Sequence, residues 1–308
     1  MEHIQKAVEK LASPRLRAAV SIQTTLLSSL TNLMREEGMM QLLPVMVSPI
    51  TDPLSHSVLE GSIKYGSIEL QLTKSMILHK QLALASGLEG VFIISPNVRL
   101  EHPERGSTGR HLLEFSQLDF EMRGRKMEDV MRFSERLLAQ AFSDVKKRHE
   151  KELELFGREL RIPSTPFRTY DSRDLEREYG PDWERIISSS SKDPVWVTNH
   201  EREFYDAEDP DKPGTFRNYD IIYPEGFGEG LSGGEREWEH SRILYRMEKK
   251  GMDASPYSAY IEAARMGKLV PSAGAGFGIE RMLRYVCGVA HIEEVSPFAK
   301  VPGKEIIF

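Results

Sequence analysis

Residues 98–122 read VRLEHPERGSTGRHLLEFSQLDFEM and predict two antiparallel strands joined by a polar loop. Side chains alternate between the faces of a strand, so Arg99 and Glu101 would share a face on the first strand. An ordinary surface hairpin also alternates polar and apolar residues. It would not gather an arginine, carboxylates and an aromatic ring on one side. The second strand would present Phe115, Gln117, Asp119 and Glu121 on one face, and Leu112, Leu118, Phe120 and Met122 on the other.

Composition favours a soluble globular enzyme, because 40% of the 308 residues are hydrophobic and 29% are charged. The net charge of −6, without a basic patch, argues against a nucleic-acid partner. The single cysteine, Cys287, excludes an internal disulfide and fits a reducing cytosol, so we expect a cytoplasmic protein. The longest apolar run, residues 42–47, is too short to span a membrane, and we find no signal peptide.

Periodicity along the chain predicts an α+β fold, with a mostly antiparallel sheet flanked by helices, because strands and helices do not alternate strictly. The apolar helix and the proline-bearing strand near Pro44 fit either a core or a subunit interface. Residues 155–219 are interpreted as an insertion within a single domain that covers residues 1–308. We expect helices over residues 14–37, 74–86, 126–154, 171–179, 182–187, 235–250 and 256–266, and strands over residues 68–72, 91–95, 194–199 and 220–224.

Several common motifs are missing from the sequence. There is no GxxxxGK[ST] phosphate loop and no GxSxG nucleophile turn, and the histidines lack metal-ligand spacing. The segment GAGFGI, residues 274–279, fails the GxGxxG pattern because it ends in isoleucine. These absences argue against the commonest NAD, zinc-hydrolase and serine-hydrolase sites.

Two glycine-rich segments complete the set of candidate functional residues. GEGLSGGERE, residues 228–237, carries Glu229 and places Arg236 at the expected start of a helix. In GFGIER, residues 276–281, a glycine-rich strand would let a flat ligand approach the backbone, and Arg281 would follow it. A guanidinium from Arg281 and the ring of Phe115 could clamp a planar heterocycle between them. With the hairpin, these segments offer cations for phosphates, a carboxylate for magnesium and a stacking site for a purine.

These residues resemble the catalytic domain of class II aminoacyl-tRNA synthetases, most closely the aspartyl and asparaginyl branch. EEGMMQLLPVMVSP is similar to the first motif of that class, residues 98–122 to the second and GAGFGIERML to the third. RHLLEFSQLDFEM and SGGERE resemble this branch in particular. The resemblance covers about residues 15–300. It implies a six- or seven-stranded antiparallel sheet and a homodimer formed through the first motif.

The resemblance also implies roles for individual residues. Arg99 and Arg281 would be catalytic, Phe115 and Arg281 would enclose the adenine of ATP, and magnesium would be held by Asp220 and Glu229. The spacing from Asp220 to Glu229 is two residues longer than usual, and Ile77 stands where the branch usually carries glutamine. The implied ATP-binding residues are Arg99, Glu101, Arg110, His111, Phe115, Glu229 and Arg281, and the implied substrate-binding residues are Ser75, Lys80, Gln117, Asp119 and Arg236.

Only about 13 residues precede the first expected helix, so we expect no anticodon-binding OB domain. This pattern is similar to archaeal-type asparagine synthetases related to asparaginyl-tRNA synthetase. The implied reaction converts aspartate, ATP and ammonia to asparagine, AMP and pyrophosphate through an aspartyl-adenylate. We therefore expect small-molecule substrates, no tRNA and no membrane. The alternatives are a truncated enzyme that transfers an amino acid to tRNA or protein, and a non-catalytic regulatory paralogue.

Overall fold

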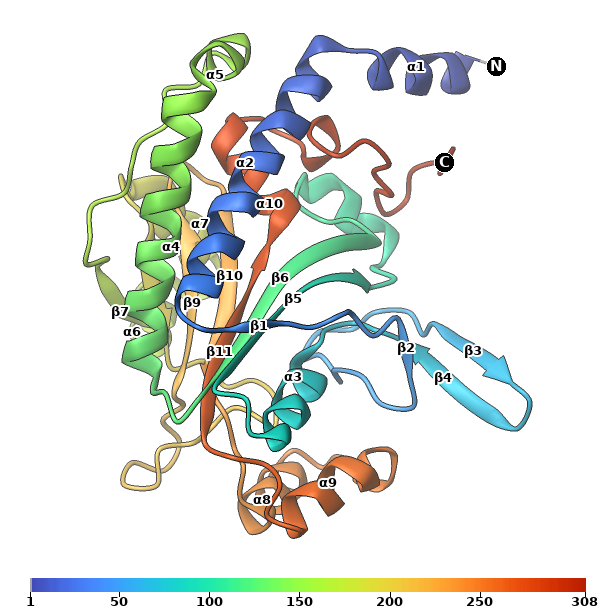
Figure 1. Cartoon of the computed structure of the whole chain (residues 1–308), viewed down its shortest axis with the longest axis vertical. Helices are drawn as coiled ribbons and strands as arrows, with labels where there is room; N and C mark the ends of the chain where they lie inside the picture. The colour runs from blue at the N-terminus through green and yellow to red at the C-terminus, as the bar shows by residue number, and fades with distance from the viewer. Residues whose placement is uncertain (1) are drawn as a thin grey trace.

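The computed structural model describes residues 2–308, which form a large mixed sheet with helices around it (Figure 1). The α-helices are α1 (Glu2–Leu11), α2 (Pro14–Glu36), α3 (Ile77–Ala83), α4 (Met127–Arg148), α5 (Glu150–Phe156), α6 (Ser172–Tyr179), α7 (Trp183–Ser190), α8 (His240–Lys249), α9 (Ser258–Arg265) and α10 (Ile279–Cys287). The strands are β1 (Met40–Gln41), β2 (Val47–Ser48), β3 (Ser62–Tyr65), β4 (Ile68–Leu72), β5 (Gly90–Val98), β6 (Glu114–Arg123), β7 (Thr169–Asp171), β8 (Val195–Thr198), β9 (Asn218–Tyr223), β10 (Gly228–Glu235) and β11 (Ser272–Gly278).

The large sheet has the strand order β1-β5-β6-β11-β10-β9-β8-β7, and a small sheet has the order β2-β4-β3. Neighbours in the large sheet are antiparallel except at its two edges, where β1 lies parallel to β5 and β7 parallel to β8. The α+β architecture is therefore confirmed, with eight strands in place of six or seven. The two edge strands have two and three residues, too few to produce a readable alternation.

The predicted hairpin is present as β5 and β6, which pair from Gly90 opposite Met122 to Val98 opposite Glu114. Both Arg99 and Glu101 lie just after the end of β5, so they occupy the connecting loop and not the strand. The predicted alternation holds on β6, where Leu118 and Phe120 are buried in the main core. Leu112 lies before β6 and joins a separate small cluster with Ile292 and Val301. The hairpin thus separates a core face from a polar face.

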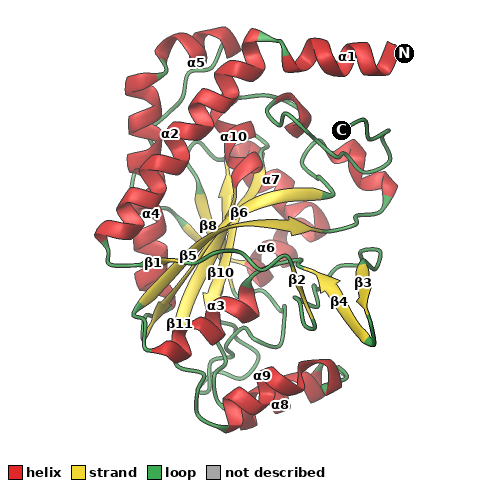
Figure 2. Ribbon diagram, turned by 45° about the vertical axis from the view of Figure 1, so that its right-hand side comes forward, coloured by secondary structure: helices red, strands yellow, loops and turns green. Residues whose placement is uncertain are grey.

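One face of the sheet is covered by α2 and α4, which run side by side along it in Figures 1 and 2. Helix α2 begins where Ser13 Oγ accepts a hydrogen bond from Leu16 N at 3.1 Å, with Pro14 in the first turn. Its residues Ile22, Leu26 and Leu30 belong to the same buried cluster as Phe120 and Phe277. The opposite face of the sheet is left for polar groups.

Three predicted elements were wrong in their extent. The helix expected over residues 126–154 is divided between α4 and α5 at His149, whose backbone leaves the helical conformation and whose imidazole hydrogen-bonds Thr25 Oγ1 at 2.7 Å. The helix expected from residue 235 begins at His240, because β10 continues through Glu235 as a partner of both β9 and β11. Pro44 lies between β1 and β2 and belongs to neither strand.

The remaining expected elements are close to those observed. Residues 155–219 contribute β7 and β8, which extend the large sheet beyond β9, together with α6 and α7. Helices α8 and α9 lie together at one end of the molecule, beyond α3 (Figures 1 and 2). Among residues 2–308, no helix combines the length and the apolar character needed to cross a membrane.

Candidate active site

A cavity of about 310 Å³ lies over the polar face of the sheet. Its wall combines residues from the loop after β2, from α3, from the β5–β6 connection and from the central strands. A smaller space of about 50 Å³ adjoins it and shares Arg99, Glu101, Arg110 and Arg281. The three sequence segments that suggested a function therefore meet in one place.

The smaller space has the features expected for a planar heterocycle. Phe115 and Arg281 both line it, together with Gly276 and Gly278, so the predicted clamp residues are brought together. The guanidinium of Arg99 lies 5.1 Å from the centre of the Phe115 ring. Arg99 Nε also donates to the Lys74 carbonyl at 3.1 Å, which fixes its side chain between the two spaces. An aromatic ring and guanidinium groups can hold a nucleobase by stacking.

Cations gather where the two spaces meet. Arg281 Nη1 lies 3.3 Å from Glu229 Oε1, and Arg110 forms an ion pair with Glu184 of α7. Loss of hydration would raise the pKa of Glu229, but the charges of Arg281 and Arg110 outweigh it and lower that pKa. Glu229 is therefore ionised at neutral pH. Glu184, which no sequence motif indicated, also accepts a hydrogen bond from Glu229 N at 3.1 Å.

Glu101 and His111, which also line both spaces, differ in their charge at neutral pH. Burial would raise the pKa of Glu101, but a hydrogen bond from His56 (Nε2···Oε1, 3.0 Å) and nearby positive charges lower it. Burial and the positive charges of Arg281 and Arg110 lower the pKa of His111 to about 3. His111 is therefore a neutral hydrogen-bonding group at neutral pH, and its Nδ1 lies 2.6 Å from Thr108 Oγ1.

The two predicted magnesium ligands are not equivalent. Glu229 lines the cavity, whereas Asp220 is held by Arg202 Nη1 at 2.7 Å and lies 3.2 Å from His200 Nε2. Within residues 2–308 no three His, Cys, Asp or Glu side chains are grouped to hold a metal ion. Mg²⁺ is commonly bound by one or two carboxylates together with substrate phosphates, so an ionised Glu229 beside a nucleotide fits that ion.

The floor of the cavity is a row of buried ion pairs, here called the ladder, formed by Asp119, Lys80, Glu121, Arg236 and Asp206. Lys80 Nζ donates to Asp119 Oδ1 at 3.2 Å and to the carbonyls of Phe120 and Ala275 at 3.1 and 3.2 Å. It also lies 3.5 Å from Glu121 Oε2. These contacts occupy all three hydrogens of the ammonium group. The predicted substrate residue Lys80 is thus in the cavity, but its charge is already paired with protein carboxylates.

Arg236 is paired in the same way. Its Nε donates to Glu121 Oε1 at 3.1 Å, its Nη1 to Asp206 Oδ1 at 3.2 Å and its Nη2 to the Gly274 carbonyl at 3.0 Å. Because Arg236 follows β10 directly, the end of that strand and not a helix start positions its guanidinium. Buried charges need such partners, since an unpaired one loses its hydration without compensation.

The glycines of β11 make room for this ladder. A Cβ at residue 274 would overlap Glu121 Oε2 and the Phe120 carbonyl, and a Cβ at residue 276 would lie 2.7 Å from Asp119 Oδ1. Strand β11 pairs with β6 so that Gly274 faces Glu121 and Gly276 faces Asp119. The glycines predicted to admit a ligand therefore first admit the carboxylates of the neighbouring strand.

The other predicted substrate residues also line the cavity. Gln117 Oε1 accepts from Asn97 Nδ2 at 2.5 Å, and Asp119 Oδ2 accepts from Ser95 Oγ at 3.2 Å. Ser75 Oγ accepts from Ile77 N at 3.2 Å. The predicted residues that line the cavity or the adjoining space are Ser75, Lys80, Arg99, Glu101, Arg110, His111, Phe115, Gln117, Asp119, Glu229, Arg236 and Arg281, whereas Asp220 lines neither.

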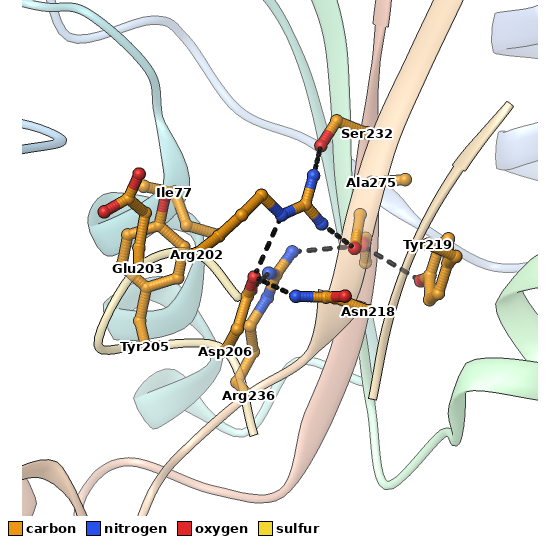
Figure 3. Close-up of polar contacts among 12 residues, drawn as sticks. Ile77, Arg202, Glu203, Tyr205, Asp206, Asn218, Tyr219, Ser232, Arg236 and Ala275 are labelled. Carbon is orange, nitrogen blue, oxygen red and sulfur yellow. Dashed lines mark hydrogen bonds and ion pairs between the residues drawn. The ribbon is translucent and has the colours of Figure 1, made fainter. Parts of the chain in front are cut away.

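Sequence reasoning missed the segment HEREFYD, residues 200–206, which supplies Arg202, Glu203, Tyr205 and Asp206 to the cavity wall. Figure 3 shows Arg202 extending from this segment towards Ser232, whose hydroxyl accepts its hydrogen bond at 2.6 Å. Asp206 lies between Arg202 and Arg236 and also accepts from Asn218 Nδ2 at 2.8 Å (Figure 3). The run combines four charged residues with two aromatic ones, and that composition was the available signal.

Comparison with known proteins gives consistent results. The family model described as "tRNA synthetases class II (D, K and N)" matches residues 2–302. An asparagine–tRNA ligase from Pyrococcus abyssi is 28% identical over 313 residues, which cover 96% of this chain and 70% of that protein. An aspartate–tRNA(Asp/Asn) ligase from Methanopyrus kandleri is 34% identical over 255 residues, covering 77% of this chain and 57% of that protein.

A solved structure has the same fold. The asparaginyl-tRNA synthetase of Pyrococcus horikoshii, crystallised with asparaginyl-adenylate, superimposes with a TM-score of 0.86 at 26% identity. The match covers 96% of this chain and 71% of that one. The eight-stranded sheet and its flanking helices are therefore the class II synthetase fold.

Proposed function

Since the chain belongs to the class II tRNA synthetases (D, K and N), enzymes of the ligase class, we propose that it makes asparagine from aspartate, ATP and ammonia. AMP and pyrophosphate are the other products, and aspartyl-adenylate is the intermediate. The Pyrococcus horikoshii relative was crystallised with asparaginyl-adenylate, which supports adenylate chemistry in a cavity of this kind.

The observation that carries this proposal is the mixed charge of the cavity floor. A free carboxylate would be drawn to unpaired cations, but Lys80 and Arg236 each already face protein carboxylates. A floor on which cations and carboxylates are already balanced suits the amino-acid head, which is neutral overall because it carries an ammonium and a carboxylate together. With the head of aspartate at the floor, its β-carboxylate is left for ATP. Activation of the β-carboxylate is what asparagine synthesis requires.

The activation step takes place where the two spaces meet, with aspartate in the larger cavity and the adenine of ATP in the smaller one. A β-carboxylate oxygen attacks the α-phosphorus of ATP, an O–P bond forms, and the bond to pyrophosphate breaks. Arg99 lies between the two spaces, where its guanidinium can stabilise the charge that develops on the phosphorus oxygens. Phe115 and Arg281 would hold the adenine, and Arg110 and His111 would bind the outer phosphates.

Magnesium would be held by Glu229, and when bound it would screen the phosphate charge from the attacking carboxylate. Asp220 is already engaged by Arg202 and His200, so Glu229 is the principal protein ligand that we propose. Gln117 and Asp119 would accept the α-ammonium group of aspartate, while Ser75 lies at the same wall.

Transfer of the activated amino acid to tRNA is the second candidate, because the relatives from Pyrococcus abyssi and Methanopyrus kandleri are named tRNA ligases. One experiment separates the two functions. Incubation with ATP, Mg²⁺, aspartate and ammonium, without tRNA, should yield asparagine and AMP. Absence of asparagine from this incubation, together with aminoacylated tRNA when tRNA is added, would reject asparagine synthesis and support the alternative.

We further propose that the enzyme is a cytoplasmic homodimer. Met40, Leu43 and Met46 are more than half exposed along the connection from β1 to β2, and Leu43 reaches 87%. Large apolar side chains concentrated on one segment indicate a surface that another protein covers. A second copy of the chain is the occupant that we propose.

A further inference from the structure

We propose that Glu203 is the catalytic residue that binds the ammonium ion and removes its proton, so that ammonia can attack the activated aspartate. This inference rests on the proposed function and names the residue for its second step. Glu203 lies in the missed segment 200–206 and lines the same cavity as Lys80 and Arg99.

Among residues 2–308, Glu203 has no cationic partner, which sets it apart from the carboxylates of the cavity floor but not from Asp52 in the same cavity wall. Glu203 is 8% exposed, and its carboxylate accepts a hydrogen bond from the Ser55 hydroxyl. Among the described residues, Lys250 lowers the pKa of Glu203 through its charge alone and forms no ion pair with it. Asp119, Glu121 and Asp206, by contrast, all form ion pairs with Lys80 or Arg236. A buried carboxylate without a cation is costly, and a small cation from solution would relieve that cost.

The negative charges around Glu203 favour binding of a proton or a cation to its carboxylate. Asp52 and Asp206 both act on it, and Asp52 is itself fixed by a hydrogen bond from Tyr205 Oη at 3.0 Å. The backbone is held by a hydrogen bond from Asp206 N to the Glu203 carbonyl at 3.2 Å. Figure 3 shows the Glu203 carboxylate directed away from the ion pairs around Asp206.

The position suits proton transfer at neutral pH. Burial and the negative charges of Asp52 and Asp206 raise the pKa of Glu203 to about 7. Charged and titratable groups that face it are Asp52, Asp206, Tyr205, Tyr257 and Lys250. A general base is most effective when its pKa lies near the working pH. Ammonium would lose one proton to Glu203 and become the neutral nucleophile.

The chemical step balances as follows. The nitrogen lone pair attacks the β-carbonyl carbon, and a C–N bond forms. The bond from that carbon to the adenylate oxygen then breaks, and AMP leaves with the electron pair. The attacking nitrogen releases its second proton to solvent, so aspartyl-adenylate and ammonium yield asparagine, AMP and protons. No oxidant or further reactant is required.

The test compares two nitrogen donors at pH 7 in the full-length enzyme. Hydroxylamine is already neutral at that pH and needs no base, whereas ammonium does. With equal substrates, the ratio of asparagine to aspartyl hydroxamate should fall by about 10²-fold in Glu203→Gln, the scale of losing a general base. At fixed total ammonium, the native asparagine rate should rise with pH and level off above about 7, whereas the variant should depend on free ammonia and keep rising above that pH. Glu203→Asp, which keeps a carboxylate, should recover part of the ratio.

The matched control is Glu201→Gln, an exposed residue two positions earlier, and its ratio should equal that of the native enzyme. An unchanged ratio in Glu203→Gln would overturn the inference. So would a parallel loss of both products with a raised KM for aspartate, which would make Glu203 a ligand of the amino-acid substrate. If native enzyme forms hydroxamate but no asparagine, or neither product, the proposed function itself fails.

Discussion

Glu280 accepts the backbone N–H of Ser116 with both carboxylate oxygens, each at 3.0 Å. The contact ties the first turn of α10 to the start of β6, and thereby joins the third and the second of the sequence segments that form the site. Burial raises the pKa of Glu280 to about 7 despite these hydrogen bonds. The carboxyl group therefore keeps its proton in the folded chain at pH values where an unfolded chain would release it.

This relationship predicts how stability depends on pH. From about pH 4.5 to about pH 7 the unfolded chain ionises Glu280 while the folded chain does not, so its contribution to stability falls as the pH rises. Glu280→Gln should raise the melting temperature at pH 8 and change it little at pH 4. Calorimetry at both pH values checks this. Equal effects at the two values would show that Glu280 does not titrate as proposed.

Arg99 and Arg281 provide the second prediction. Arg99→Ala or Arg281→Ala should reduce ATP–pyrophosphate exchange by roughly 10²-fold or more, the scale of losing one donor that stabilises developing charge. Arg265→Ala is the control, because that arginine is paired with Glu262 on the exposed face of α9, away from the cavity. Native exchange rates in both site variants would remove these residues from the catalytic machinery.

The substrate preference is the third prediction. Asparagine synthesis requires two carboxylates, one in the amino-acid head and one to be activated, and asparagine has only the first. Aspartate should therefore be preferred over asparagine by on the order of 10³-fold or more in ATP–pyrophosphate exchange. Efficient exchange with asparagine would contradict asparagine synthesis and support transfer of asparagine to tRNA.

Arg236 gives a prediction about stability as well as activity. Its side chain is 3% exposed and its guanidinium lies between Glu121 and Asp206, so Arg236→Ala would leave two buried carboxylates short of a cation. Breaking such an arrangement typically costs about 3–5 kcal/mol. Urea unfolding should show a loss of that order, with activity abolished. A loss below about 1 kcal/mol, the range of an exposed ion pair, would mean that the ladder is not a structural unit.

The fifth prediction concerns assembly. The native chain should be a dimer in light scattering at micromolar concentration, and the double variant L43D/M46D should be a monomer, because it places charges in the proposed apolar interface. Leu155→Asp, on the exposed side of α5, is the control and should leave the dimer intact. A native monomer would contradict the assignment of this surface.

The hairpin could be predicted because its residues alternate regularly and its pairing is local. The glycine strand could be predicted because glycine recurs at every second position from residue 274 to residue 278, although its partners β6 and β10 are distant in sequence. The ends of β10 could not, because GERE is equally compatible with a helix and only pairing with β9 and β11 keeps it extended. The segment at residues 200–206 has no regular alternation. It enters the site through a turn in which Asn199 adopts a positive φ of 67° and through contacts with residues distant in sequence. Contacts between residues that are distant in sequence produce no periodic pattern of polar and apolar residues from which they could be predicted.

The close approach of Gly274 to Glu121 has a consequence for how this site can evolve. Any side chain at residue 274 would displace the Glu121 carboxylate that holds Arg236. A shorter residue at position 121 would leave Arg236 without this partner and would leave a void beside β11. Neither position can change alone without cost. Among relatives, glycine at the first position and glutamate at the second should be inherited as a pair, so that covariation marks lineages that have kept this floor.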